Sequence, residues 1–550
     1  LKDHGKLHSS AKDKANILNK QYQSVFSDED LTNIPSPDGQ QFPPMDDIIV
    51  TEEGVKKLLR NINPHKASGP DGIPARVLKE CADDLAPLLT TIFNKTLEEG
   101  TVPDDWRSAN VSAIFKKGSK NVASNYRPVS LTSLCCKLQE HVLASSIMRH
   151  LNHHGILTDA QHGFRARRSC ETQLLTLVHE LSGSLDKGRQ TDLIILDFSK
   201  AFDRVPHQRL LRKLHHYGVR GPTLRWIEAF LNNRTQQVVL DGETSDQVPV
   251  TSGVPQGSVM GPLLFLLFIN DLPDQLHSRV RLFADDCIVY REIKTSRDCD
   301  LLQQDLNTLA CWEAKWGMEF HPQKCNVLTC SRARKPVSFD YKLKGHHLER
   351  ATTSKYLGVD LSNNISWKTH VDRITNKANS MLGFLRRNLK TSNGRVKSNA
   401  YFTLVRPHLE YCSSVWNPHT ADLSTKIEQV QRRAARYVSN DYQQKSSVTA
   451  MLQKLQWETL ESRRTKGQLT MLYKTLNDLV DIQPAEYVRP NTGRTRSHHS
   501  LKLHLIPART NSFKFSFFPR TIPTWNSLPA SVAEAPSLAS FKRELSKLSF

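Results

Sequence analysis

Two short apolar runs in the middle of the chain end at acidic residues or are interrupted by them. Residues 193–196 read Leu-Ile-Ile-Leu, a β-branched run typical of a buried strand, and Asp197 follows directly. Residues 281–290 form a second apolar stretch that contains Asp285 and Asp286. A charged side chain in such surroundings costs free energy unless it is paired with an opposite charge or binds a metal. The three carboxylates therefore predict a Mg²⁺ site of the kind that assists phosphoryl transfer.

The rest of the chain shows helical and strand-like patterns. A helix is expected from Thr51, and two helical stretches are expected to flank Pro87. The pattern predicts a strand over residues 109–115, a buried helix over 263–272 and an amphipathic helix over 427–438. The middle of the chain is thus strand-rich and the part after it mostly helical, and no repeat of fixed period is evident.

Composition favours a nucleic-acid partner. The chain has 75 Lys and Arg against 55 Asp and Glu, a formal charge of +20, which attracts polyanions.

Its ten cysteines include no Cys-x-x-Cys pair and no zinc-finger spacing, and they predict reduced thiols in an intracellular protein. The longest apolar run, residues 262–269, is far shorter than a membrane span, and no secretory signal opens the chain. Because the first residue is Leu1 and not Met, we expect a fragment of a longer product.

Three motifs in order along the chain are similar to motifs A, B and C of reverse transcriptases. They are Leu-Asp-Phe-Ser-Lys-Ala-Phe-Asp at 196–203, Gly-Val-Pro-Gln-Gly-Ser at 253–258 and Phe-Ala-Asp-Asp at 283–286. More specifically, the chain resembles the polymerase of non-LTR retrotransposons of the jockey and chicken-repeat type. Further matching segments lie at residues 68–74, 125–131, 161–165, 355–359 and 406–411. The likeness therefore extends over nearly the whole chain.

The resemblance implies an α+β fold shaped as a right-hand polymerase, with an antiparallel palm sheet packed on helices. It places fingers at residues 51–190, the palm with its catalytic motifs at 191–360 and a helical thumb at 361–480. Residues 1–50 are expected to be an N-terminal lead-in and linker, and residues 481–550 a small basic C-terminal extension.

The resemblance also implies roles for individual residues. Asp197 and Asp285, assisted by Asp286, would bind two Mg²⁺ ions, for which Mn²⁺ could substitute. Phe202 matches the steric gate that excludes a 2′-hydroxyl, so the implied substrate is a deoxynucleotide. Lys324 matches the lysine that protonates departing pyrophosphate. Asp203 is expected to have a structural role.

Other residues are expected to bind substrate or nucleic acid. Those for the incoming nucleotide are Lys116 and Arg127 on its phosphates, the backbone of Phe198, Ser199, Lys200 and Ala201 as an anion cradle, and Gln256 with Gly257 at the templating pair. The primer grip would be Lys355, Tyr356, Leu357 and Gly358. Nucleic acid is expected at Arg432, Arg433, Arg436, Arg489, Arg494 and Arg496. Alternating Phe513, Phe515 and Phe517 predict a half-buried strand packed against the thumb.

These expectations favour an RNA-directed DNA polymerase that extends a DNA primer along an RNA template, working in the cytoplasm and nucleus at a DNA target. An endonuclease domain is expected on a missing upstream segment, because the lead-in is too short to hold one. One alternative is a catalytically inactive RNA-binding descendant, which would tolerate loss of the carboxylates. Another is an RNA-templated RNA polymerase, against which Phe202 argues.

Overall fold

The computed structural model describes residues 1–550 except 4, 392 and 492–498. The chain has a mixed helix–strand fold that divides into two compact units. Unit 1 comprises residues 1–164, 197–276 and 305–321, and unit 2 comprises residues 165–196, 277–304 and 322–550. No helix among the described residues is long and apolar enough to cross a membrane.

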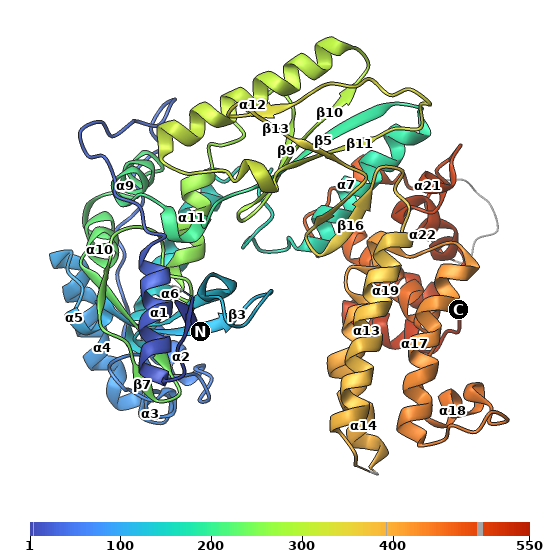
Figure 1. Cartoon of the computed structure of the whole chain (residues 1–550), viewed down its shortest axis with the longest axis horizontal. Coiled ribbons are helices and arrows are strands. Elements are labelled where there is room, and N and C mark those ends of the chain that lie inside the picture. Colours follow the sequence, from blue (N-terminus) through green and yellow to red (C-terminus); the bar gives the residue numbers. More distant parts are fainter. Residues whose placement is uncertain (4, 392, 492–498) are drawn as a thin grey trace. The chain divides into compact units, whose positions relative to one another are not determined.

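Unit 1 contains a five-stranded sheet in the order β4-β3-β6-β7, with β8 also paired to β6. Its strands are β3 (Ser108–Phe115), β4 (Tyr126–Leu131), β6 (Arg234–Leu240), β7 (Glu243–Thr244) and β8 (Val248–Val250). The β3 strand, which the sequence pattern predicted over residues 109–115, runs parallel to β6 and antiparallel to β4. Helix α1 (Ala11–Gln23) packs on β6 and buries Leu18 and Tyr22 against Val111 and Val238. The lead-in is thus part of this unit (Figure 1).

Helices make up most of the rest of unit 1. They are α2 (Glu52–Arg60), α3 (Ala75–Glu80), α4 (Ala82–Glu99), α5 (Asp104–Arg107), α6 (Leu134–His153), α8 (Ala201–Arg204), α9 (His207–His216), α10 (Gly221–Leu231), α11 (Met260–Ile269) and the second half of α12 (Ser296–Trp316). Nine of the ten residues of α11 are buried, which confirms the predicted buried helix but ends it at Ile269. The expected helix break at Pro87 is wrong. The break lies at Cys81, and Pro87 is inside α4, where it removes a hydrogen bond but does not end the helix.

Unit 2 contains a second five-stranded sheet, in the order β14-β11-β5-β10-β9. Its strands are β5 (Gln190–Asp197), β9 (Arg279–Phe283), β10 (Asp286–Ile293), β11 (Asn326–Cys330) and β14 (Glu349–Ala351). The β5 strand is buried from Gln190 to Leu196 because its side chains on both faces are covered. Asp197 is its last residue, as the sequence predicted.

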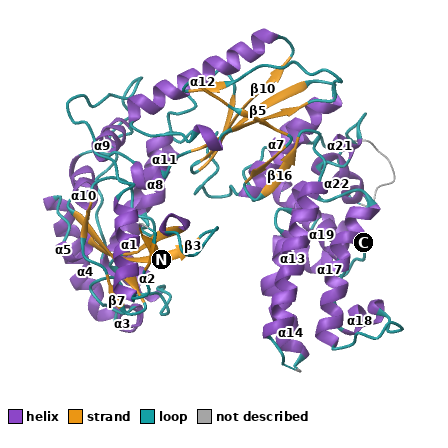
Figure 2. Ribbon diagram, in the orientation of Figure 1, coloured by secondary structure: helices purple, strands orange, loops and turns teal. Residues whose placement is uncertain are grey.

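The remainder of unit 2 is mainly helical (Figure 2). Its helices are α7 (Cys170–Asp186), α13 (Lys368–Asn388), α14 (Gly394–Ala400), α15 (Arg406–Glu410), α16 (Ser413–Trp416), α17 (Ala421–Ser439), α18 (Val448–Lys454), α19 (Leu460–Leu476), α20 (Pro484–Tyr487), α21 (Asn511–Lys514), α22 (Phe517–Asn526), α23 (Ala530–Ala533) and α24 (Leu538–Ser546). A large core joins α13, α17, α19 and α22. The short hairpins β12 (Lys342–Leu343) with β13 (His346–His347) and β15 (Thr353–Tyr356) with β16 (Val359–Ser362) complete the unit.

The strand expected around residues 513–517 is wrong, because these residues lie in and between two helices. The hydroxyl of Thr510 accepts a hydrogen bond from the N–H of Phe513 and starts α21, and α22 begins at Phe517. The expected packing of the rings is confirmed: Phe517 is buried, and Phe515 stacks on His419 with 4.3 Å between ring centroids. A local cap therefore overrides the two-residue alternation.

Candidate active site

The turn after β5 is held by backbone contacts with a second segment of unit 1. The N–H of Ser199 donates to the carbonyl of Glu319 at 2.7 Å, and the N–H of His321 donates to the carbonyl of Asp197 at 2.8 Å. Phe198 is buried and stacks on Phe320 with 4.2 Å between centroids. Asp197 is half-buried at the strand end.

The next two residues of this turn lead into a helix. Lys200 is exposed and has a φ of 53°, in the left-handed region that residues with a Cβ rarely adopt. Its unusual backbone turns the chain so that α8 begins at Ala201. Strain of this kind is often retained where it places functional groups.

A tight hairpin carries the paired carboxylates in unit 2. Phe283 of β9 pairs with Asp286 of β10, so Ala284 and Asp285 form a two-residue turn. Ala284 has a φ of 52°, a conformation that glycine adopts more readily. Asp285 is half-buried at the tip and Asp286 is exposed. Because β5 and β10 are neighbours in one sheet, Asp197 and this carboxylate pair lie at the ends of adjacent strands.

The chemistry of these donors fits a hard divalent cation, since carboxylate oxygens are the ligands that such ions prefer. Reverse transcriptases as a family require a divalent metal ion. Among the residues that the structure describes, no group of three or more His, Cys, Asp or Glu side chains is placed to hold a metal ion. The three-carboxylate site therefore stays a prediction.

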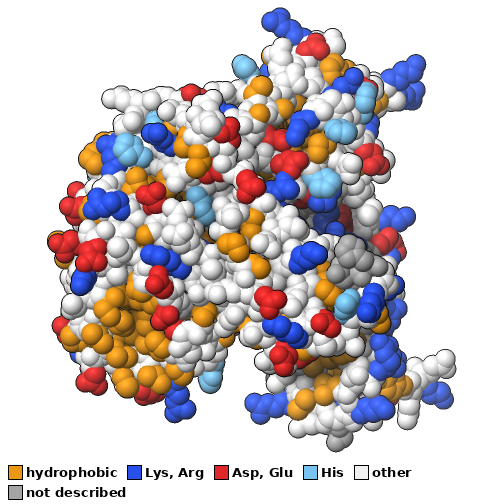
Figure 3. All heavy atoms as spheres, turned by 60° about the vertical axis from the view of Figure 1, so that its left-hand side comes forward, with side chains coloured by type: hydrophobic (Ala, Val, Ile, Leu, Met, Phe, Trp, Pro, Cys, Tyr) orange, Lys and Arg blue, Asp and Glu red, His pale blue; other side chains and the backbone are white. Residues whose placement is uncertain are grey.

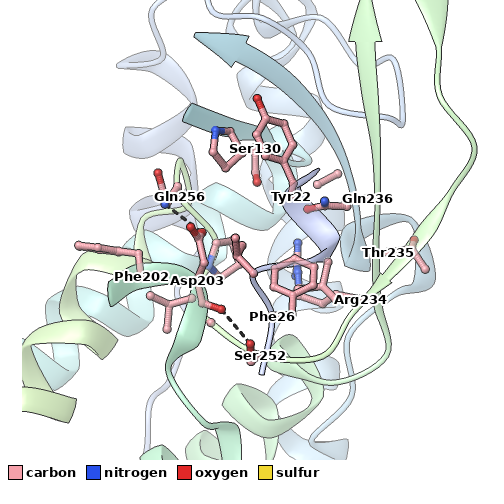
Figure 4. A pocket seen from close by; sticks show the side chains of 17 residues that line it. Tyr22, Phe26, Ser130, Phe202, Asp203, Arg234, Thr235, Gln236, Ser252 and Gln256 are labelled. Atoms are coloured by element: carbon pink, nitrogen blue, oxygen red, sulfur yellow. Dashed lines mark hydrogen bonds between the residues drawn. The ribbon is translucent and has the colours of Figure 1, made fainter. Parts of the chain in front are cut away.

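Phe202, Asp203 and Gln256 come together beside a small cavity in unit 1 (Figure 4). Gln256 Nε2 donates to Asp203 Oδ1 at 3.0 Å, which fixes the orientation of the amide. The ring of Phe202 extends away from these polar groups and stacks on Phe265 of α11, with centroids 4.3 Å apart and planes at 16°. Burial raises the pKa of the Asp203 carboxyl, while Lys200 and the Gln256 hydrogen bond oppose that rise. Asp203 thus supports Gln256, in keeping with its expected structural role.

The loop that carries Gln256 approaches β4 very closely. The carbonyl of Gln256 accepts a hydrogen bond from the N–H of Ser130 in β4 at 2.7 Å. Gly257 has a φ of +118°, and a Cβ there would lie 2.4 Å from the carbonyl oxygen of Ser130. Only glycine fits this position.

Replacing Gly257 by alanine is therefore expected to destabilise the protein by about 2–4 kcal/mol, because it adds both backbone strain and a clash. Gly242→Ala is the matched control: its φ of +85° is strained, but a Cβ there meets nothing within 4 Å. Urea unfolding of both variants measures the difference. An equal decrease in the free energy of unfolding in the two variants would contradict the close approach of this loop to β4.

Lys116 and Arg127 lie at the loop end of the β3–β4 hairpin, where Phe115 pairs with Tyr126 and Ile114 with Arg127. Both cations are exposed. Desolvation and the nearby charges of Arg127 and Lys117 lower the pKa of the Lys116 ammonium, and the charge of Asp197 opposes the shift. Two positive side chains this close to each other favour the binding of an anion.

The segment from Lys355 to Gly358 forms the tip of the β15–β16 hairpin, with Lys355 exposed and Tyr356 buried. Leu357 and Gly358 both have positive φ, 45° and 85°, as a two-residue turn of this type requires. The hydroxyl of Tyr411 donates to the carbonyl of Leu357 at 3.0 Å, and a guanidinium N–H of Arg373 donates to that of Gly358 at 2.8 Å. The hairpin is thus fixed to the helices of unit 2.

The remaining predicted residues lie in unit 2 or outside the described residues. Lys324 is exposed in a short 3₁₀ helix, Pro322–Lys324. On α17, Arg432 and Arg433 are exposed, as expected from the helix pattern, whereas Arg436 donates to the carbonyl of Gln443 at 2.9 Å. Arg489 is exposed, and Arg494 and Arg496 lie outside the described residues. Figure 3 shows basic and acidic side chains interspersed over one face of the molecule.

The sequence did not indicate several residues around the cavity. Tyr22 and Phe26 come from the lead-in, Arg234 from the start of β6, and Ser252 from the loop before Gly253. Arg234 is 3% exposed and donates to the carbonyl of Phe230 at 3.0 Å. Only Ser252, next to the Gly-Val-Pro-Gln-Gly motif, lay near a recognisable signal.

Comparison with known proteins agrees with this arrangement. Residues 114–361 match the family described as reverse transcriptase (RNA-dependent DNA polymerase). The chain is 29% identical over 408 residues to the RNA-directed DNA polymerase from mobile element jockey of Drosophila melanogaster, covering 71% of this chain and 44% of that protein. It is 29% identical over 409 residues to the jockey polymerase of Drosophila funebris, with the same coverage of 71% and 44%.

A further relative is the protein of Drosophila melanogaster named "Probable RNA-directed DNA polymerase from transposon BS", 27% identical over 479 residues, covering 83% of this chain and 50% of that protein. The chain thus spans about half the length of these curated relatives. The matches confirm the resemblance that the motifs indicated. Residues 114–361 therefore match the reverse transcriptase family, and the chain as a whole is similar to the RNA-directed DNA polymerases of mobile element jockey and transposon BS.

Proposed function

We propose that the chain is an RNA-directed DNA polymerase of a non-LTR retrotransposon, which adds deoxynucleotides to a DNA primer on an RNA template. The observation that carries the proposal is the position of Asp197 and of the Asp285–Asp286 pair at the ends of adjacent strands, inside the matched domain. These carboxylates would hold two Mg²⁺ ions. When bound, the ions would activate the primer 3′-hydroxyl and neutralise the triphosphate.

The chain's own residues would bind and orient the nucleotide. Lys116 and Arg127 would contact its phosphates, since their mutual repulsion is relieved by an anion. The amides of residues 198–201 would contribute, except that of Ser199, whose N–H is already donated to Glu319. Phe202 would lie against the sugar, and the fixed amide of Gln256 against the templating pair.

The two units suggest how the polymerase regions are distributed. We assign the palm to the sheet of β5, β9, β10 and β11, the fingers to the β3–β4 hairpin with the helices before it, and the thumb to α13 and α17 with their neighbours. The β15–β16 hairpin would seat the primer end, and Lys324 would protonate pyrophosphate.

The exposed arginines of α17 and Arg489 would neutralise phosphates of the RNA template or of the target DNA, together with Arg436, Arg494 and Arg496. The endonuclease would lie on a separate upstream segment, and the relatives are longer than the span that this chain matches. The alternative, an inactive RNA-binding descendant, is less favoured because Asp197, Asp285 and Asp286 are all present. Extension of a DNA primer on an RNA template tests the proposal directly.

A further inference from the structure

A segment that is distant in sequence from the polymerase motifs lines the cavity beside Phe202 and Asp203. Tyr22, Val25 and Phe26 line this cavity together with both residues, although the matched domain begins only at residue 114. The cavity holds about 40 Å³, room for one or a few waters but not for a nucleotide. The cavity therefore lies among residues that support the site residues, and it is not the nucleotide pocket.

Hydrogen bonds join this segment to helix α8 and to the loop that carries Gln256. The N–H of Ser27 donates to Ser252 Oγ at 2.9 Å, and Ser252 Oγ donates to the carbonyl of Asp203 at 2.8 Å. Ser27 Oγ donates to the carbonyl of Arg204 at 3.3 Å. Ser252 thus links the lead-in, the end of α8 and the loop that carries Gln256.

Glu29 adds a second attachment just after α8. Its carboxylate accepts hydrogen bonds from the N–H groups of Gln208 and Arg209 at 2.8 and 2.9 Å, and from Arg209 Nη1 at 3.1 Å. Helix α9 begins at His207, so these are free amides of its first turn, where a negative charge is favourable. The Glu29 side chain is only 10% exposed.

We propose that the lead-in from Tyr22 to Glu29 positions Phe202, Asp203 and Gln256, so that discrimination between deoxy- and ribonucleotides depends on a segment outside the polymerase motifs. The inference rests on the proposed function. Ser252 and Glu29 are positioning residues: they fix the backbone on either side of α8, and that backbone sets where the Phe202 ring and the Gln256 amide lie. A displacement of about 1 Å at such a site is enough to change rates strongly.

The test compares Ser252→Ala and Glu29→Gln with wild type for kcat/KM of dNTP and rNTP on one RNA template and DNA primer, and for Tm. Both variants are expected to lower the dNTP/rNTP ratio, by about tenfold for Ser252→Ala. The variant Ser252→Thr keeps the hydroxyl, and the adjoining cavity has room for the added methyl group. Ser252→Thr should therefore keep the dNTP/rNTP ratio close to that of wild type. The control Asn33→Ala changes an exposed residue just after this segment and should leave the ratio within about twofold of wild type.

A double variant separates positioning from general destabilisation. If Ser252 acts through Phe202, Ser252→Ala should lower the ratio little further once Phe202→Val is present. A lower Tm with an unchanged ratio in Ser252→Ala and Glu29→Gln would overturn the inference and leave the proposed function intact. Absence of extension by the wild type would remove the proposed function and, with it, the inference.

Discussion

Replacing Asp285 by asparagine is expected to reduce primer extension by at least about a thousandfold, because the amide cannot supply the charge that a bound divalent cation needs. The change is nearly isosteric, and the two-residue turn that holds Asp285 depends on the backbone of Ala284 and not on the carboxylate. Binding of a primer–template should stay close to wild type, since it depends mainly on basic residues elsewhere. Single-turnover extension and a filter-binding titration measure the two effects.

Asp84→Asn is the control for this prediction, because it changes an exposed residue of another Asp-Asp pair, in the first turn of α4. It should extend the primer at the wild-type rate. Extension by Asp285→Asn at a rate near that of wild type would remove the carboxylate from the catalytic site.

Replacing Phe202 by valine is expected to lower the dNTP/rNTP ratio of kcat/KM by about a hundredfold, while dNTP use falls only modestly. In the proposed role of Phe202, the substitution would remove a clash with a ribose 2′-hydroxyl and not a contact with the base. Phe202 is half-buried, and its stacking on Phe265 holds the ring in one orientation, as a steric barrier requires. Steady-state incorporation of matched dNTP and rNTP pairs gives the ratio.

Phe513→Val is the control here, a half-buried ring in unit 2 that packs near His179. It should leave the ratio unchanged even if Tm falls. If Phe202→Val likewise lowers Tm and leaves the ratio unchanged, Phe202 is only a packing residue beside α11.

The strand ends and the candidate carboxylates could be predicted because their signals are local. A β-branched run followed by Asp197 predicts a buried strand and its end, and the structure confirms β5. The buried helix α11 was similarly clear from its unbroken apolar run. By contrast, the alternation at Phe513–Phe517 misled, because the Thr510 cap starts a helix there.

The surroundings of Phe202 could not be predicted because they depend on contacts between distant segments. Ser27 meets Ser252 across 225 positions of sequence, and Glu29 meets Arg209 across 180. Neither contact leaves a period or a motif in the sequence, and residues 1–50 were expected to be a lead-in and linker. Their packing on β6 is a property of the tertiary fold.

We propose that this chain copies RNA into DNA, and primer extension by the purified chain measures that activity directly. The assay uses an RNA template annealed to a DNA primer, Mg²⁺, and either four dNTPs or four rNTPs, with and without EDTA. We expect a DNA product of template length with dNTPs, no product after chelation of the metal ion and little product with rNTPs. No extension with dNTPs, or extension only with rNTPs, would contradict it.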